Sequence, residues 1–174
     1  MPNTALDAAY ELLKTGAFEE AVEAFAACIA TAPQEPGAYR GRALAQFQLK
    51  QWEAAAGDFA RALELDPAEL DNRVGLGMSL AMTHRVYEAV DILEALVGEH
   101  PAYVRGRIQL GLLYYRLCVT AKGREQLEAA LASRPTLDER RCIEQKLKEE
   151  KQLDQKRYYR PDFEALRKRQ SGKS

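Results

Sequence analysis

The sequence has little of what most secreted proteins and metal sites require. Its 174 residues include only three cysteines and two histidines. The cysteines (Cys28, Cys118 and Cys142) are odd in number and never occur as a CxxC pair. This pattern supports neither a disulfide framework nor a zinc site, which needs several convergent ligands.

Long apolar runs and a secretory signal are also missing. No stretch of about 18 apolar residues occurs, so no membrane-spanning helix is expected. The start, MPNTALDAAY, lacks the basic and then apolar stretch of a signal peptide, and a cytoplasmic protein is the expectation. Residues 1–135 carry 13 Lys/Arg against 18 Asp/Glu, whereas residues 136–174 carry 12 against 8. An acidic body with a basic tail suits self-association or self-docking.

Motifs for catalysis or phosphate binding are absent as well. The stretch VGLGMSL, with Gly75 and Gly77, lacks the full GxGxxG pattern and follows no strand, so both glycines are expected to serve helix packing. His84 and His100 have no ligand partner at a recurring spacing and are expected to be exposed turn residues. No Ser/His/Asp or Cys/His arrangement stands out. We therefore expect no enzyme activity, no cofactor and no metal.

What the sequence does contain is an internal repeat with a constant step. Four similar segments, AFAACIATAP, DFARALELDP, ILEALVGEHP and QLEAALASRP, end in evenly spaced prolines: Pro33, Pro67, Pro101 and Pro135. Large apolar and small residues keep the same step, in columns such as Phe25, Phe59, Leu93, Leu127 and Ala9, Ala43, Gly77, Gly111. Each unit holds two segments with apolar residues at helical spacing. One helix pair cannot bury its apolar faces, so neighbouring units are expected to stack.

This repeat resembles the tetratricopeptide repeat family over residues 2–137. The second unit, GAYRGRALAQFQLKQWEAAAGDFARALELDP, carries the small, aromatic and closing positions of the family motif at Ala43, Trp52, Ala55, Phe59, Ala62 and Pro67. The fourth unit departs from it, with Thr120 in the aromatic position and Gly123 in place of Ala. The turn glycine of the family is present at Gly16 and is replaced elsewhere by Lys50, His84 and Cys118.

The resemblance implies an all-α fold, a right-handed α-solenoid of helix-turn-helix repeats with a C-terminal capping helix. The predicted units are residues 2–35, 36–69, 70–103 and 104–137. The capping helix is predicted over 138–157, because Thr136 and Glu139 have capping-box spacing and three apolar residues can cover the last repeat: Leu137, Ile143 and Leu147. The remainder, 158–174, is a basic tail with a segment, PDFEALRKR, that has the pattern of a short amphipathic helix.

In the family, the first helix of each unit lines a concave groove that holds a peptide or a helix. The matching positions here predict a groove with an apolar floor and three arginines: Leu6, Tyr10, Leu13, Arg40, Leu44, Phe47, Val74, Met78, Arg105, Ile108, Leu112, Tyr115 and Arg116. An exposed apolar patch of this kind usually marks a binding site. One subset of the family grips a C-terminal carboxylate, which needs convergent donors. The matching residues cannot supply them, so no such chaperone tail is expected as a partner: Leu6, Tyr10, Gly41, Asp71 and Gly75.

These features predict a non-enzymatic scaffold that binds a peptide or amphipathic helix of a partner protein. Two alternatives stay open: a cytosolic chaperone that shields an apolar segment of a secreted or assembling client, and a self-assembling structural protein. In the self-assembling alternative, a homo-oligomer would form through docking of four tail residues: Tyr158, Tyr159, Phe163 and Leu166. The other interpretation of this tail is a mobile chain end. Nucleic acid is not an expected ligand, because the basic cluster is short and the body is acidic.

Overall fold

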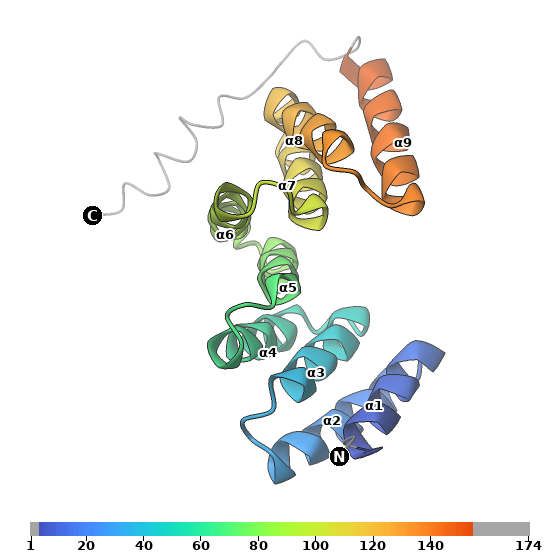
Figure 1. The fold of residues 1–174 in the computed structure, drawn as a ribbon, viewed down its shortest axis with the longest axis vertical. Coiled ribbons are helices and arrows are strands. Elements are labelled where there is room, and N and C mark those ends of the chain that lie inside the picture. Colours follow the sequence, from blue (N-terminus) through green and yellow to red (C-terminus); the bar gives the residue numbers. More distant parts are fainter. Residues whose placement is uncertain (1–3, 155–174) are drawn as a thin grey trace, which may run out of the picture. The chain divides into compact units, whose positions relative to one another are not determined.

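The computed structural model describes residues 4–154 of the chain (Figure 1). Every regular element in that range is an α-helix, which confirms the predicted all-α class. The helices are α1 (Thr4–Thr15), α2 (Phe18–Thr31), α3 (Pro36–Gln48), α4 (Trp52–Leu65), α5 (Leu70–Met82), α6 (Val86–Glu99), α7 (Val104–Arg116), α8 (Thr120–Ala132) and α9 (Leu137–Asp154).

The helix starts keep the step of the sequence repeat. The first helices α3, α5 and α7 begin at Pro36, Leu70 and Val104, and the second helices α2, α4, α6 and α8 begin at Phe18, Trp52, Val86 and Thr120. The chain divides into two compact units, unit 1 (Met1–Ile92) and unit 2 (Leu93–Ser174). Within unit 1, α1 to α5 pack consecutively, and α3 also packs against α1 and α5.

The turns between paired helices keep one backbone conformation even where glycine is missing. Gly16 has a φ of 83°, and its equivalents in the next three repeats have φ values of 59°, 64° and 59°: Lys50, His84 and Cys118. In the second turn the Gln51 N–H donates to the Gln46 carbonyl at 2.9 Å, which is the closing bond of a Schellman motif. These turns are therefore as tight as the glycine turn, although a side chain in the left-handed region costs roughly 1–2 kcal/mol.

The junctions of unit 1 are built from a phenylalanine and a glycine. Phe25 of α2 is buried, and a Cβ on Gly41 of α3 would overlap its ring. Phe59 of α4 stands in the same relation to Gly75 of α5, one repeat later. Both glycines therefore serve close helix packing, as expected for Gly75, and neither belongs to a phosphate loop.

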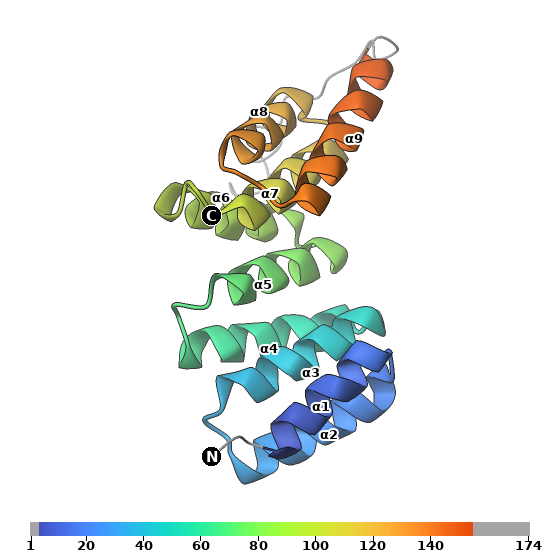
Figure 2. The same ribbon diagram turned by 45° about the vertical axis from the view of Figure 1, so that its right-hand side comes forward.

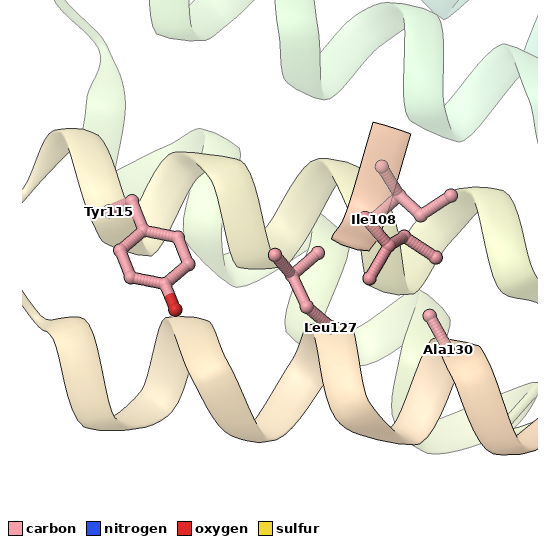
Figure 3. Packing of buried hydrophobic residues seen from close by; sticks show 5 residues of the cluster. Ile108, Tyr115, Leu127 and Ala130 are labelled. Carbon is pink, nitrogen blue, oxygen red and sulfur yellow. The ribbon is translucent and has the colours of Figure 1, made fainter. Parts of the chain in front are cut away.

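The core of unit 2 joins α7, α8 and α9. Ile108 and Tyr115 of α7 pack with Leu127 and Ala130 of α8, and Figure 3 shows these side chains pointing into the space between the two helices. Ile143 of α9 is completely buried in the same cluster. Ile143 stands one repeat after Gln109 of α7, so α9 continues the register of a first helix and covers the end of the repeat.

The start of α9 has the predicted N-terminal capping box but lacks one predicted apolar contact. The Thr136 N–H donates to Glu139 Oε2 at 2.8 Å and the Glu139 N–H donates to Thr136 Oγ1 at 3.3 Å, which confirms the predicted capping box. Leu147 packs against the cluster as predicted. Leu137 does not: it is 63% exposed, because it stands in the first turn and the buried stripe of α9 begins with Ile143. Residues 155–157 of the predicted capping helix lie outside the described residues.

Candidate functional site

The predicted groove residues of unit 1 come from three neighbouring helices. Because α3 packs against α1 and α5, the first helices of unit 1 are neighbours (Figure 2). We use the name α1–α3–α5 face for the predicted groove positions on these helices, with Met82 added: Leu6, Tyr10, Leu13, Arg40, Leu44, Phe47, Val74, Met78 and Met82. Met82 stands one helical turn after Met78 and belongs to the same set of family positions.

The apolar side chains of this face are mostly half-buried rather than open. Val74 is 3% exposed and belongs to the core, whereas Met82 is 38% exposed. The remaining apolar members are intermediate: Leu6, Tyr10, Leu13, Leu44, Phe47 and Met78. The cause is packing within the unit, since the residues of α1 rest on the cluster around Phe25 and those of α3 rest on the cluster around Phe59. The residues of the predicted floor are therefore only partly accessible to a ligand.

Polar groups lie along the edge of the face where α3 and α5 begin. The Tyr10 hydroxyl donates to the Gly37 carbonyl at 2.8 Å, and Arg40 Nη1 lies 2.8 Å from Glu69 Oε2. Glu69 and Glu35 are also the N-cap residues of α5 and α3, where their carboxylates accept backbone N–H bonds.

The charges at this edge act on Tyr10. Burial raises the pKa of the Tyr10 hydroxyl; the Arg40 guanidinium opposes that rise, and the Glu35 and Glu69 carboxylates add to it. Tyr10 is therefore a neutral hydrogen-bond donor that fixes α1 to the first turn of α3.

The predicted groove residues of unit 2 differ from those of unit 1 in their exposure to solvent. Ile108 and Tyr115 are 6% and 4% exposed, because α9 packs onto the cluster that contains them. Lys146 of α9 places its Nζ 5.4 Å from the centroid of the Tyr115 ring and 2.9 Å from Glu150 Oε1. Leu112 is half-buried against the same cluster, and Arg105 and Arg116 are exposed. The predicted tail contacts lie outside the described residues: Tyr158, Tyr159, Phe163 and Leu166.

Sequence reasoning missed two pockets that involve the second helices. In unit 1, α4, α5 and α6 enclose about 370 Å³, lined mainly by Ala56, Ala60, Leu76, Leu80 and Ile92. In unit 2, α6, α7 and α8 enclose about 500 Å³, lined by residues that include Glu94, Leu110, Tyr114, Lys122 and Gln126. Ala60, Leu76, Leu80 and Ile92 stand one repeat before Glu94, Leu110, Tyr114 and Gln126. The two pockets therefore occupy equivalent places in successive repeats. Small residues such as Ala56 and Gly57 were the sequence signal for the unit 1 pocket.

The polar side chains of the unit 2 pocket bind one another. The Tyr114 hydroxyl donates to the Glu94 carboxylate, and Lys122 Nζ lies 3.9 Å from Glu94 Oε1. Arg107 donates to Gln126 Oε1 at 2.9 Å. In the unit 1 pocket the charged groups are at the rim, where Arg85 pairs with Glu88 and lowers the pKa of that carboxyl group through their hydrogen bonds.

Neither a metal-binding cluster nor a membrane-spanning helix is found among residues 4–154. No three His, Cys, Asp or Glu side chains in that range gather closely enough to hold a metal ion. His84 and His100 are exposed, as expected, and Cys28 is buried as a small apolar residue. Among the described helices, none combines the length and the apolar character needed to cross a bilayer.

Comparison with known proteins identifies the repeat. Residues 36–69 match the family profile described as Tetratricopeptide repeat. The chain thus contains a tetratricopeptide repeat. Among curated proteins, sperm-associated antigen 1 of Mus musculus is 31% identical over 91 residues, which are 52% of this chain and 10% of that protein. The match thus spans a small part of this relative.

Solved structures share the fold of this chain. TTC0263, a thermophilic TPR protein of Thermus thermophilus, superposes with a TM-score of 0.75 at 21% identity, over 88% of this chain and 85% of that one. A MamA crystal structure gives 0.67 at 20% identity, over 75% and 76%. MamA 41-end from Desulfovibrio magneticus RS-1 gives 0.65 at 20% identity, over 90% and 96%. These likenesses show the α-solenoid fold, and tetratricopeptide-repeat proteins generally mediate protein–protein interaction.

Proposed function

We propose that this chain is a non-enzymatic interaction scaffold whose α1–α3–α5 face binds a peptide or amphipathic helix of a partner protein. The observation that supports this best is the set of half-buried apolar side chains on three adjacent first helices. Covering such side chains removes apolar area from water, at roughly 25 cal/mol per Å². The unbranched side chains of Met78 and Met82 suit a surface that adapts to the shape of a ligand.

Within unit 2, the same reasoning assigns different roles to the predicted residues. Ile108 and Tyr115 are buried against α9 and therefore support the helix surface from beneath. Arg105 and Arg116 are exposed and are the positions that a partner can reach. Leu112 is half-buried and is the apolar position between them.

The test is affinity capture with the full chain and a double variant, Met78→Glu with Met82→Glu. Two carboxylates on the face would have to be desolvated beneath an apolar ligand, so we expect at least a tenfold loss of the captured partner. The matched control is Ala54→Glu, a change at an exposed position of α4. Thermal unfolding, monitored by circular dichroism, is used to check that both variants fold. Equal capture by the double variant and the control contradicts the proposal.

A further inference from the structure

The two units carry opposite net charge. Residues 1–92 contain 7 Lys/Arg and 14 Asp/Glu, a formal net charge of −7, whereas residues 93–174 contain 18 and 12, a charge of +6. Unit 1 also carries the α1–α3–α5 face. A ligand that approaches that face therefore meets a negative electrostatic potential. A positively charged ligand associates faster with such a surface and is preferred over a negatively charged one.

Acidic groups also stand next to the face itself. Glu35, Glu69 and Asp71 lie at the starts of α3 and α5 and are half-buried, so a ligand can still reach them. Glu69 forms an ion pair with Arg40, the arginine of the face. The edge of the face is thus lined by three carboxylates.

Unit 2 shows which kind of segment fits against a first helix of this protein. There, α9 packs Ile143 and Leu147, which lie one helical turn apart, onto the cluster of α7 and α8. Its Lys146 lies over the Tyr115 ring. Leu112, which packs against that cluster, is the repeat equivalent of Leu44 and Met78 on the α1–α3–α5 face. Because α9 takes the place of a next first helix, which α3 and α5 hold in unit 1, it shows that an amphipathic helix with a cation beside its apolar stripe packs on the end of this repeat.

We propose that the α1–α3–α5 face selects a basic amphipathic helix, with large apolar side chains one turn apart and Lys or Arg beside them. This inference rests on the proposed function and names the class of partner. The apolar stripe covers Leu44, Phe47 and Met78, and the cations face Glu35, Glu69 and Asp71. An acidic helix of the same apolar pattern is repelled at that edge.

A defined probe for this chemistry is a synthetic peptide with the sequence of residues 155–174, QKRYYRPDFEALRKRQSGKS. It carries 7 Lys/Arg against 2 Asp/Glu, and its Phe163 and Leu166 are three residues apart in the sequence. Its matched control keeps every apolar residue and replaces all Lys and Arg by Gln. In fluorescence anisotropy with the full chain, we expect the basic peptide to bind about tenfold more tightly than the control and to weaken with added salt.

Protein variants locate the effect on the face. Glu35→Gln with Glu69→Gln should weaken binding of the basic peptide about fivefold, the size expected for two partly screened charge pairs. The control, Glu20→Gln with Glu23→Gln, makes the same charge change at exposed positions of α2 and should change affinity less than twofold. Because Glu35 and Glu69 are N-caps, Asp71→Asn provides a second face variant that keeps both caps.

The inference is overturned if the basic and Gln peptides bind equally, if neither binds, or if the α2 control weakens binding as much as the face variants. In each of these cases the proposed function is judged separately by capture. If Met78→Glu with Met82→Glu still loses its partner, the scaffold function stands and only the preference for a basic helix fails.

Discussion

Units 1 and 2 build the same helix junction from different side chains. In unit 1 a phenylalanine of the second helix lies on a glycine of the next first helix, as in Phe59 on Gly75. In unit 2 the corresponding residues are Leu127 of α8 and Ile143 of α9, which share one cluster. A phenylalanine ring leaves no room for a side chain on the next helix, whereas a leucine leaves room for a branched one. The comparison teaches that the size of the residue on the second helix sets what the neighbouring first helix can carry.

The largest effect should come from emptying the unit 2 junction. Ile143→Ala removes a completely buried side chain from the cluster that holds α9, and we expect a loss of about 3 kcal/mol in unfolding free energy. Urea unfolding measures it. Leu137→Ala, a change at an exposed residue of the same helix, should alter stability by less than about 0.5 kcal/mol. A loss below about 1 kcal/mol for Ile143→Ala would show that α9 is not fixed through this junction.

The second effect comes from overfilling a unit 1 junction. Gly75→Ala places a Cβ against the Phe59 ring, and we expect a net loss of about 2 kcal/mol, despite the better helix propensity of Ala. Gly57→Ala is the matched control, because no atom lies within 4 Å of its added Cβ, and it should stabilise the protein by up to about 1 kcal/mol.

Adding Phe59→Leu to Gly75→Ala converts the junction toward the form found in unit 2. The ring is then no longer in the way of the new methyl group, so the double variant should recover at least about 1 kcal/mol relative to the sum of the single changes. A double-mutant cycle in urea measures this coupling. Additive losses would mean that the two positions do not share one volume.

The smallest effect concerns the turns, where the two units agree. Lys50 has a φ of 59°, so Lys50→Gly relieves left-handed strain and should stabilise the protein by about 0.5–1 kcal/mol after the greater chain entropy of glycine is counted. Lys50→Ala removes the same charge without relieving the strain and should be neutral within about 0.5 kcal/mol. Equal effects of Gly and Ala in thermal unfolding would point to charge instead of backbone conformation.

Much of the fold was predictable because the constant spacing of the repeat can be recognised in the sequence. Pro33, Pro67, Pro101 and Pro135 mark the step that the helix starts keep, and Thr136 with Glu139 marks the start of α9. The turn conformation was not predictable at Lys50 or Cys118, since neither residue favours a positive φ. There, the hydrogen bonds that close the turn outweigh the local preference.

The position of the candidate site stays a prediction, and the exposure of its residues could not be derived from the sequence. Family positions place Leu44, Phe47 and Met78 on α3 and α5, which pack together. They could not show that Val74, Ile108 and Tyr115 are buried, because burial depends on how closely neighbouring helices approach. The pockets beside the second helices were missed for a similar reason: they exist where small residues leave space, and the same columns hold larger residues in other repeats.

Hydroxyl-radical footprinting of the full chain, alone and with its captured partner, tests the scaffold function most directly. Met78 and Met82 lie on the α1–α3–α5 face and contain readily oxidised sulfur, while Cys142 is exposed on α9 and serves as the internal control. The account predicts that the partner lowers oxidation of Met78 and Met82 at least threefold and leaves Cys142 unchanged. Unchanged oxidation of both methionines in the complex would contradict it.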